Sequence, residues 1–251
     1  MAAAPRFSWR LATVAVVVVI ATVAARWPLA WTTRWLPDSV QCGVPAGSLW
    51  HGRCGALTIA GLPLGDTSWQ VRLLPLLRGT LAATLVSRQG ADQFSADLEW
   101  RPDGRRILRN VDAELTLGAG LLSRSAFGLA GRAQVRLGRV VLRDRRVLDL
   151  AGLVSVRRLA QGNTPLGDYE VRFPEVPPAG NGTKAPAGQL RDIGGPLGVT
   201  GTITLTDEPG YVVAGMVTTR ADTAPALAAQ IAYLGTPDAQ GRRPFSLAGT
   251  Y

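Results

Sequence analysis

The chain has 251 residues, enough for one large domain or two small ones. It is 47% hydrophobic and 18% charged, a composition that excludes an intrinsically disordered chain. The formal net charge is +9, and it comes almost entirely from arginine because Lys184 is the only lysine. The 29 glycines and 17 prolines fall between short apolar stretches, which favours an all-β fold with many turns.

An uncharged, mostly apolar run near the N-terminus, Leu11–Ala25, lies between Arg10 and Arg26. As a helix it would be ~22 Å long, shorter than the ~30 Å hydrocarbon core of a bilayer. Trp9 and Trp27 flank the run at a helical spacing of ~27 Å, which suits the two aromatic belts of a membrane. We therefore predict one transmembrane helix near residues 9–27, with a cytoplasmic N-terminus because arginines precede the run.

A cleaved signal peptide is the alternative interpretation of this run, since Val23–Ala25 offers the small residues that a signal peptidase needs. Trp27, Trp31 and Trp35 recur every four residues and would share one helix face at the membrane surface, which favours a retained anchor. The predicted organisation is a cytoplasmic tip, anchor and juxtamembrane segment over residues 1–36. Residues 37–251 would form a β domain outside the cytoplasm.

Strand-period alternation recurs after the anchor and predicts antiparallel strands with one covered face. It is clearest in "DQFSADLEW" and "NVDAELTL", which are separated by the turn sequence "RPDG". Because a tight turn pairs the strands on either side of it, their apolar positions should form one continuous surface. The residues predicted for this surface, a candidate groove, are Phe94, Leu98, Trp100, Val111 and Leu115, with Ala113 and Leu117 between and beside them.

Helices should be few and short. Residues 222–234 form the best candidate, with Asp222 as cap, Pro225 in the first turn and Gly235 at the end. A helical turn is expected at Leu121–Phe127. One short helix is too small to cover so many strands, so we expect the apolar surface to be partly open, with a closed core as the alternative.

A weak internal similarity links "LPLGDTSWQVRLLP" (62–75) with "TPLGDYEVRFPE" (164–175). A third segment, "GGPLGVTGTITL" (194–205), begins in the same way. Related turn-and-strand units in two halves of the chain would explain the similarity. Chance likeness in a sequence rich in glycine, leucine and proline explains it equally.

Catalytic chemistry has little support. His51 is the only histidine, and Cys54, three residues further on, is a conceivable nucleophile for it. The segment contains no nucleophile elbow, and the chain has no H-E-x-x-H or C-x-x-C motif. We predict an exposed turn histidine, no catalytic or metal-binding residues, no cofactor and no enzymatic activity.

The two cysteines favour a disulfide. A chain that follows the anchor outward enters an oxidising compartment, and Cys42 and Cys54 enclose a short segment rich in turn formers. Two buried thiols are the alternative.

Arginines alternate with apolar residues in "GRAQVRLGRVVLRDRRVLDL" (131–150), which predicts a strand with a basic outer face. Such a face could bind anionic lipid headgroups or an acidic protein, or it could simply be solvated. No aromatic residues are interleaved to stack on bases, and we predict no nucleic-acid partner.

The segment 46–85 resembles the central motif of the type II secretion system protein N family, a G-[ST]-[LV]-W-x-G turn followed by G-x-x-L-G and W-x-[LV]-x-P-x-x-L-L-x-G. The closing "LGTPDAQGRRPFSLAGTY" (234–251) is also similar to the end of that family. The motif residues are Gly47, Trp50, Gly52, Gly65, Trp69, Pro75 and Gly79.

The resemblance implies a single-pass protein of the bacterial inner membrane with most of the chain in the periplasm. It would assist the export of folded proteins across the outer membrane through contacts with other type II secretion proteins. The implied fold is mainly β, a curved antiparallel sheet of the AsmA-like kind, whose apolar face can bind lipid. Trp50 would be a core plug beneath a sharp turn, and His51 and Cys54 lie outside the motif.

Overall fold

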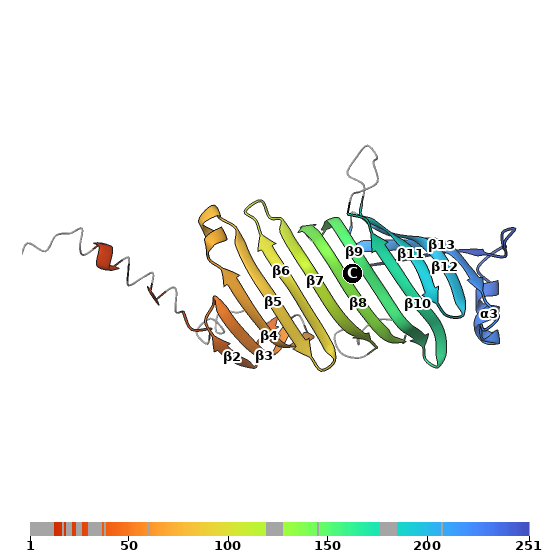
Figure 1. The fold of residues 1–251 in the computed structure, drawn as a ribbon, viewed down its shortest axis with the longest axis horizontal. Coiled ribbons are helices and arrows are strands. Elements are labelled where there is room, and N and C mark those ends of the chain that lie inside the picture. The colour runs from red at the N-terminus through yellow and green to blue at the C-terminus, as the bar shows by residue number, and fades with distance from the viewer. Residues whose placement is uncertain are drawn as a thin grey trace, which may run out of the picture.

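One antiparallel sheet of 14 strands dominates the computed structural model (Figure 1). The structure describes residues 13–16, 18, 22–23, 27–29, 37, 39–59, 61–118, 128–144, 146–175, 185–206 and 208–250. Besides the sheet it contains the 3-10 helix η2 (Leu74–Arg78) and the α-helix α3 (Pro225–Ala232). The expected mainly β fold with few short helices is confirmed in this part of the chain.

The strands follow one another across the sheet in chain order, except that β1 and β2 both pair with β3. Their bounds are β1 Val40–Gln41, β2 Val44–Gly47, β3 His51–Ile59, β4 Leu62–Arg72, β5 Leu81–Gln89, β6 Asp92–Trp100, β7 Arg106–Leu117, β8 Leu129–Arg143, β9 Arg146–Gln161, β10 Thr164–Phe173, β11 Ala187–Gly194, β12 Leu197–Leu205, β13 Gly210–Thr219 and β14 Arg243–Thr250.

Short turns produce this up-and-down order. Gly90 and Gly162, with φ of 60° and 58°, each begin a two-residue connection between neighbouring strands. Such tight hairpins need positive φ, which glycine adopts without a steric cost. The turn chemistry read from the sequence is thus the physical reason for the meander.

Residues paired across neighbouring strands point to the same side, and this divides the sheet into two unlike faces. We call one the apolar face. Its members include Val71, Leu85, Phe94, Ala96, Leu98, Trp100, Leu108, Val111, Ala113, Leu115, Ala133, Val135, Leu137, Leu150, Val154, Val156, Tyr169, Val171, Phe173, Leu190, Leu197, Val199, Ile203, Val213, Val217 and Phe245. We call the opposite side, which carries arginines and carboxylates, the charged face.

Helix α3 is shorter than the 222–234 predicted from the sequence, and its cap differs. The N-cap is Ala224 and no side chain caps the helix, so the expected cap at Asp222 is wrong. The Thr223 hydroxyl instead donates to the Pro196 carbonyl, which fixes the start of the helix to the turn before β12. Gly235, expected to close the helix, follows it with φ of 108°.

Nothing in the described part of the chain forms a helix that is both long and apolar enough to cross a membrane. The helix predicted near residues 9–27 lies largely outside the described residues. The helical turn predicted at Leu121–Phe127 lies outside them as well, and so does Lys184.

Candidate functional site

The motif tryptophan Trp69 lies against Gly52 on the neighbouring strand. The two residues are paired across β3 and β4, and a Cβ added to Gly52 would lie 2.3 Å from Cζ2 of the Trp69 ring. The Trp69 indole N–H also donates to the Leu49 carbonyl at 2.9 Å. The indole therefore occupies the space that a side chain at position 52 would need. Its hydrogen bond to Leu49 connects the β2–β3 turn to β4.

Trp50, the expected core plug, is half-buried, and so is Trp69. Trp50 contributes through its backbone, whose carbonyl accepts a hydrogen bond from Val71 N at 2.7 Å. Gly47 and Gly65 have φ of 86° and 71°, and a Cβ on either would lie 2.4 Å from a backbone oxygen. Both motif glycines are thus required by close backbone contact and by conformation.

The remaining motif residues build η2. Pro75 lies in the first turn of this helix, and Gly79 caps it in the left-handed conformation with φ of 71°. The motif accordingly describes one local structure, a β3–β4 pair followed by a sharp helical turn into β5.

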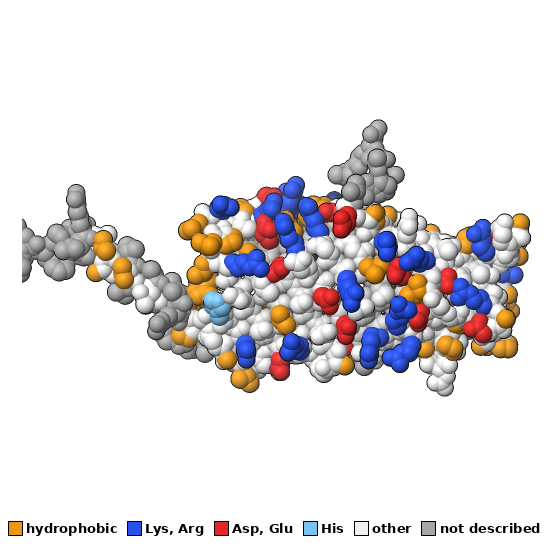
Figure 2. Space-filling model, in the orientation of Figure 1, with side chains coloured by type: hydrophobic (Ala, Val, Ile, Leu, Met, Phe, Trp, Pro, Cys, Tyr) orange, Lys and Arg blue, Asp and Glu red, His pale blue; other side chains and the backbone are white. Residues whose placement is uncertain are grey.

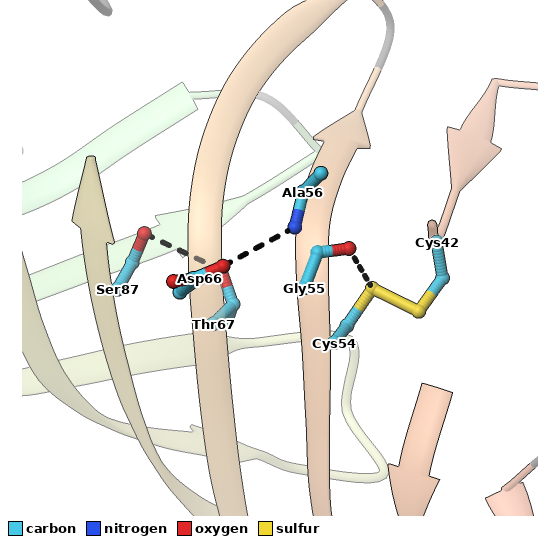
Figure 3. Close-up of a disulfide and its surroundings, with 7 residues drawn as sticks. All are labelled: Cys42, Cys54, Gly55, Ala56, Asp66, Thr67 and Ser87. Carbon is cyan, nitrogen blue, oxygen red and sulfur yellow. Dashed lines mark hydrogen bonds between the residues drawn. A yellow bond between two sulfur atoms is a disulfide. The ribbon is translucent and has the colours of Figure 1, made fainter. Parts of the chain in front are cut away.

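Cys42 and Cys54 form a disulfide in the structure, with 5.6 Å between their Cα atoms (Figure 3). Cys54 is 1% exposed and lies in a row with Thr67 of β4 and Ser87 of β5, both also buried. The Thr67 hydroxyl donates to Ser87 Oγ at 3.3 Å. The disulfide links the segment before β2 to β3, the first long strand of the sheet.

His51 is the first residue of β3 and is exposed, and its backbone pairs with Ser48 across the β2–β3 turn. Cys54, the conceivable nucleophile for this histidine, is bonded to Cys42, so His51 and Cys54 do not form a pair of base and nucleophile. Across the described residues, no three histidine, cysteine, aspartate or glutamate side chains lie close enough to hold a metal ion.

The apolar face brings the five candidate groove residues onto one side of the sheet. Phe94 pairs with Ala113, and Leu98 pairs with Leu108, across β6 and β7. Phe94, Leu98 and Leu115 are half-buried and Trp100 is 47% exposed. Val111 is 7% exposed, so it belongs to the buried part of the face and not to an open surface.

Leu108 is an apolar-face residue that the sequence pattern assigns to the other side. The register between β6 and β7 shifts by one residue, and Asn110 has φ of 50° at that point. A bulge of this kind moves every residue beyond it to the opposite face. Asparagine tolerates positive φ, so Asn110 was the one available signal.

Only the C-terminal end of the apolar face is covered by a helix in the described structure. Leu227 of α3 packs with Leu197, Val199 and Val217 to form a buried cluster. Partly buried neighbours extend this cluster to Leu166, Tyr169, Leu190, Ala224, Ile231 and Phe245. Among the described residues, no helix packs against the apolar side chains from β6 to β9.

A polar group lies at the border of the covered region. Tyr169 donates from its hydroxyl to the Leu166 carbonyl at 2.6 Å. Asp192 accepts from Val199 N at 2.9 Å and pairs with the Arg220 guanidinium. Burial, with the Asp192 carboxylate next in effect, raises the pKa of the Tyr169 phenol to about 12. Sequence reasoning missed this group because its members are distant along the chain.

Ion pairs between different strands cross the charged face. The side turned to the viewer in Figure 2 carries arginines and carboxylates across the sheet. The pairs include Arg72–Asp97, Arg109–Glu99, Arg136–Asp112, Arg139–Asp149, Arg157–Asp168 and Arg191–Glu170. Hydrogen bonds from Thr84 and Asn110, followed by the Arg72 charge, lower the pKa of Asp97 despite its burial. The basic strand predicted at 131–150 thus contributes to a mixed-charge surface.

The fold and this face together define an open-sheet β protein whose apolar face is only partly covered. Residues 38–246 match the model of the family "Type II secretion system (T2SS), protein N", and the chain belongs to this family. Neither the curated proteins nor the solved structures contain a match.

Proposed function

We propose that the protein is an inner-membrane-anchored, periplasmic component of a type II secretion system that contacts other secretion proteins through its apolar face. The family match over residues 38–246 supports a role in a type II secretion system. The apolar run Leu11–Ala25 supports the anchor, and the Cys42–Cys54 disulfide is consistent with an oxidising compartment. No catalytic step is proposed.

One observation carries the proposed contact. The apolar face continues from β4 to β14, whereas the packed cluster beneath α3 reaches only its C-terminal part. Half-buried side chains such as Leu98, Val135 and Val154 remain without a covering layer in the described structure. Contiguous exposed apolar surface of this kind normally marks a partner or ligand site.

The test is purification of the full chain from detergent-solubilised inner membranes of cells that express the complete secretion system. We expect at least one other secretion protein to co-purify. A Leu98→Asp variant should lose that protein, whereas Gln134→Asp on the charged face should retain it. Recovery of the wild-type chain without a secretion protein would contradict the proposal.

Lipid binding on the same face is the second candidate function, and it is what the AsmA-like resemblance implies. Its support is the composition of the uncovered region, in which aliphatic side chains of β6 to β9 lie in adjacent rows. Lipid extraction from the same preparation separates the two functions. Phospholipid that is retained by the wild type and lost in Leu98→Asp, without a protein partner, would favour lipid binding.

A further inference from the structure

An exposed cluster of leucines lies at one end of the sheet, away from the centre of the apolar face. We call it the leucine tip: Leu73, Leu74, Leu77, Leu81 and Trp100. Leu74 and Leu77 are 80% and 86% exposed, although both belong to the ordered turn η2. In Figure 1 this turn is the orange coil at the upper left of the sheet, and Figure 2 shows apolar side chains gathered there.

The tip is held in place by its own backbone. Leu76 N donates to Leu73 O at 3.1 Å, and Thr80 N donates to Pro75 O at 3.1 Å. Across the sheet Leu81 pairs with Trp100, which brings the tryptophan of β6 beside the turn. These hydrogen bonds hold the leucines in exposed positions. Because contact between a cluster of apolar side chains and water is unfavourable, we expect the cluster to contact an apolar partner.

Two arginines beside the tip have no carboxylate partner among the described residues, whereas the nearby Glu99 is already paired with Arg101 and Arg109. Arg78 is exposed and forms no ion pair with any described residue. Arg106 lies over the Trp100 ring, 5.0 Å from its centroid, and likewise has no described carboxylate partner. Leucines and a tryptophan flanked by free arginines have the chemistry of a surface that enters the headgroup region of an anionic bilayer.

The chain also arrives at this end of the sheet from the apolar run. Leu49 N donates to Trp27 O at 3.1 Å, and Pro28 forms a bridge with Ser48. The adjoining Trp50 is bonded to Val71, three residues before Leu74 in the tip. In the sequence, the run Leu11–Ala25 ends two residues before Trp27. A bilayer that holds the run must therefore begin close to this end of the sheet.

We propose that the leucine tip inserts into the surface of the anionic bilayer that holds the N-terminal run. The tip is then a second membrane contact, and it orients the sheet relative to the membrane. This inference rests on the membrane anchoring proposed above.

The test uses the full chain reconstituted into vesicles of phosphatidylethanolamine and phosphatidylglycerol. Leu77→Cys is labelled with an environment-sensitive fluorophore under non-reducing conditions, so that the native disulfide does not react. Ala239→Cys, in an exposed turn before β14, serves as the matched control. Vesicle flotation is measured for both proteins. We expect both to float, and only the Leu77 label to shift to the blue and be quenched by nitroxide-bearing lipids.

Arg78→Glu added to the Leu77→Cys protein should reduce the quenching. Floating protein with a water-exposed Leu77 label would overturn the tip insertion alone and would leave the tip to a protein partner. Failure of both labelled proteins to float would refute the anchoring and, with it, the insertion.

Discussion

The backbone N–H of Arg158 in β9 donates a hydrogen bond to the Asp168 carboxylate in β10, with 2.6 Å between nitrogen and Oδ1. Arg158 has φ of 50°, a conformation that an L-residue adopts only with strain. The guanidinium of Arg157 pairs with the same carboxylate at 3.3 Å. Asp168 thus stabilises the irregular backbone of β9 at Arg158.

The same arrangement occurs in the N-terminal half of the sheet. Ala56 has φ of 53°, and its N–H donates to Asp66 Oδ1 at 3.4 Å. In both places a P-L-G-D sequence carries the acceptor, ten residues after the strained residue. The internal similarity of 62–75 and 164–175 therefore corresponds to a shared local structure.

Asp168→Ala should lower the free energy of unfolding by about 1–3 kcal/mol, because a backbone donor loses its charged acceptor. Arg158→Gly should be tolerated, since glycine adopts positive φ freely. Urea denaturation of the purified chain measures both. Asp222→Ala, at an exposed turn before α3, is the control, and an equal effect there would contradict the role of Asp168.

Gly52→Ala should destabilise the protein, because the new methyl group would overlap the Trp69 ring. The expected loss is about 1–3 kcal/mol, as for other overpacked sites. Gly138→Ala is the matched control, since no atom lies within 4 Å of the added Cβ.

His51→Ala should change the free energy of unfolding by less than about 0.5 kcal/mol and leave secretion intact. Loss of secretion in the folded His51→Ala protein would revive a catalytic interpretation.

Replacing both Cys42 and Cys54 by serine should lower the free energy of unfolding by about 3 kcal/mol, the value for closing a loop of this length. Wild-type protein in reductant should show a similar loss. Mass spectrometry of a non-reduced digest detects the bond directly. Alkylation of both thiols without reductant would contradict it.

The alternation of β6 and β7 was readable from the sequence, because Phe94 and Ala113 occupy the expected side and the expected pair. The side of Leu108 was not, since one bulged residue, Asn110, reverses the pattern. Alternation likewise gives the side of Val111 but not its burial, which depends on neighbouring strands.

The helix near the C-terminus illustrates another limit. Its position and Pro225 were predictable from local signals, but its start was not. The start depends on the bond of Thr223 to Pro196, a contact between segments that are distant in sequence. The Tyr169, Asp192 and Arg220 group escaped detection for the same reason.

The Tyr169 phenol should remain protonated at a pH where ordinary tyrosines, with a pKa near 10, are ionised. Its raised pKa of about 12 means that the folded protein keeps a proton that the unfolded chain releases. The free energy of unfolding should therefore fall as pH rises from about 10 to about 12.

Titration of phenolate absorbance should show one late step, which disappears in Tyr169→Phe. Tyr233→Phe removes an exposed tyrosine and serves as the control. A late step that survives in Tyr169→Phe would contradict the assignment.

Photo-crosslinking in cells that carry the complete secretion system tests the proposed contact through the apolar face. A photoreactive amino acid placed at Leu98 probes the apolar face, and one placed at Gln134 probes the charged face. We expect crosslinks from position 98 to another secretion protein and none from position 134. Crosslinks from position 134 alone, or none from position 98 in folded and secretion-competent protein, would contradict it.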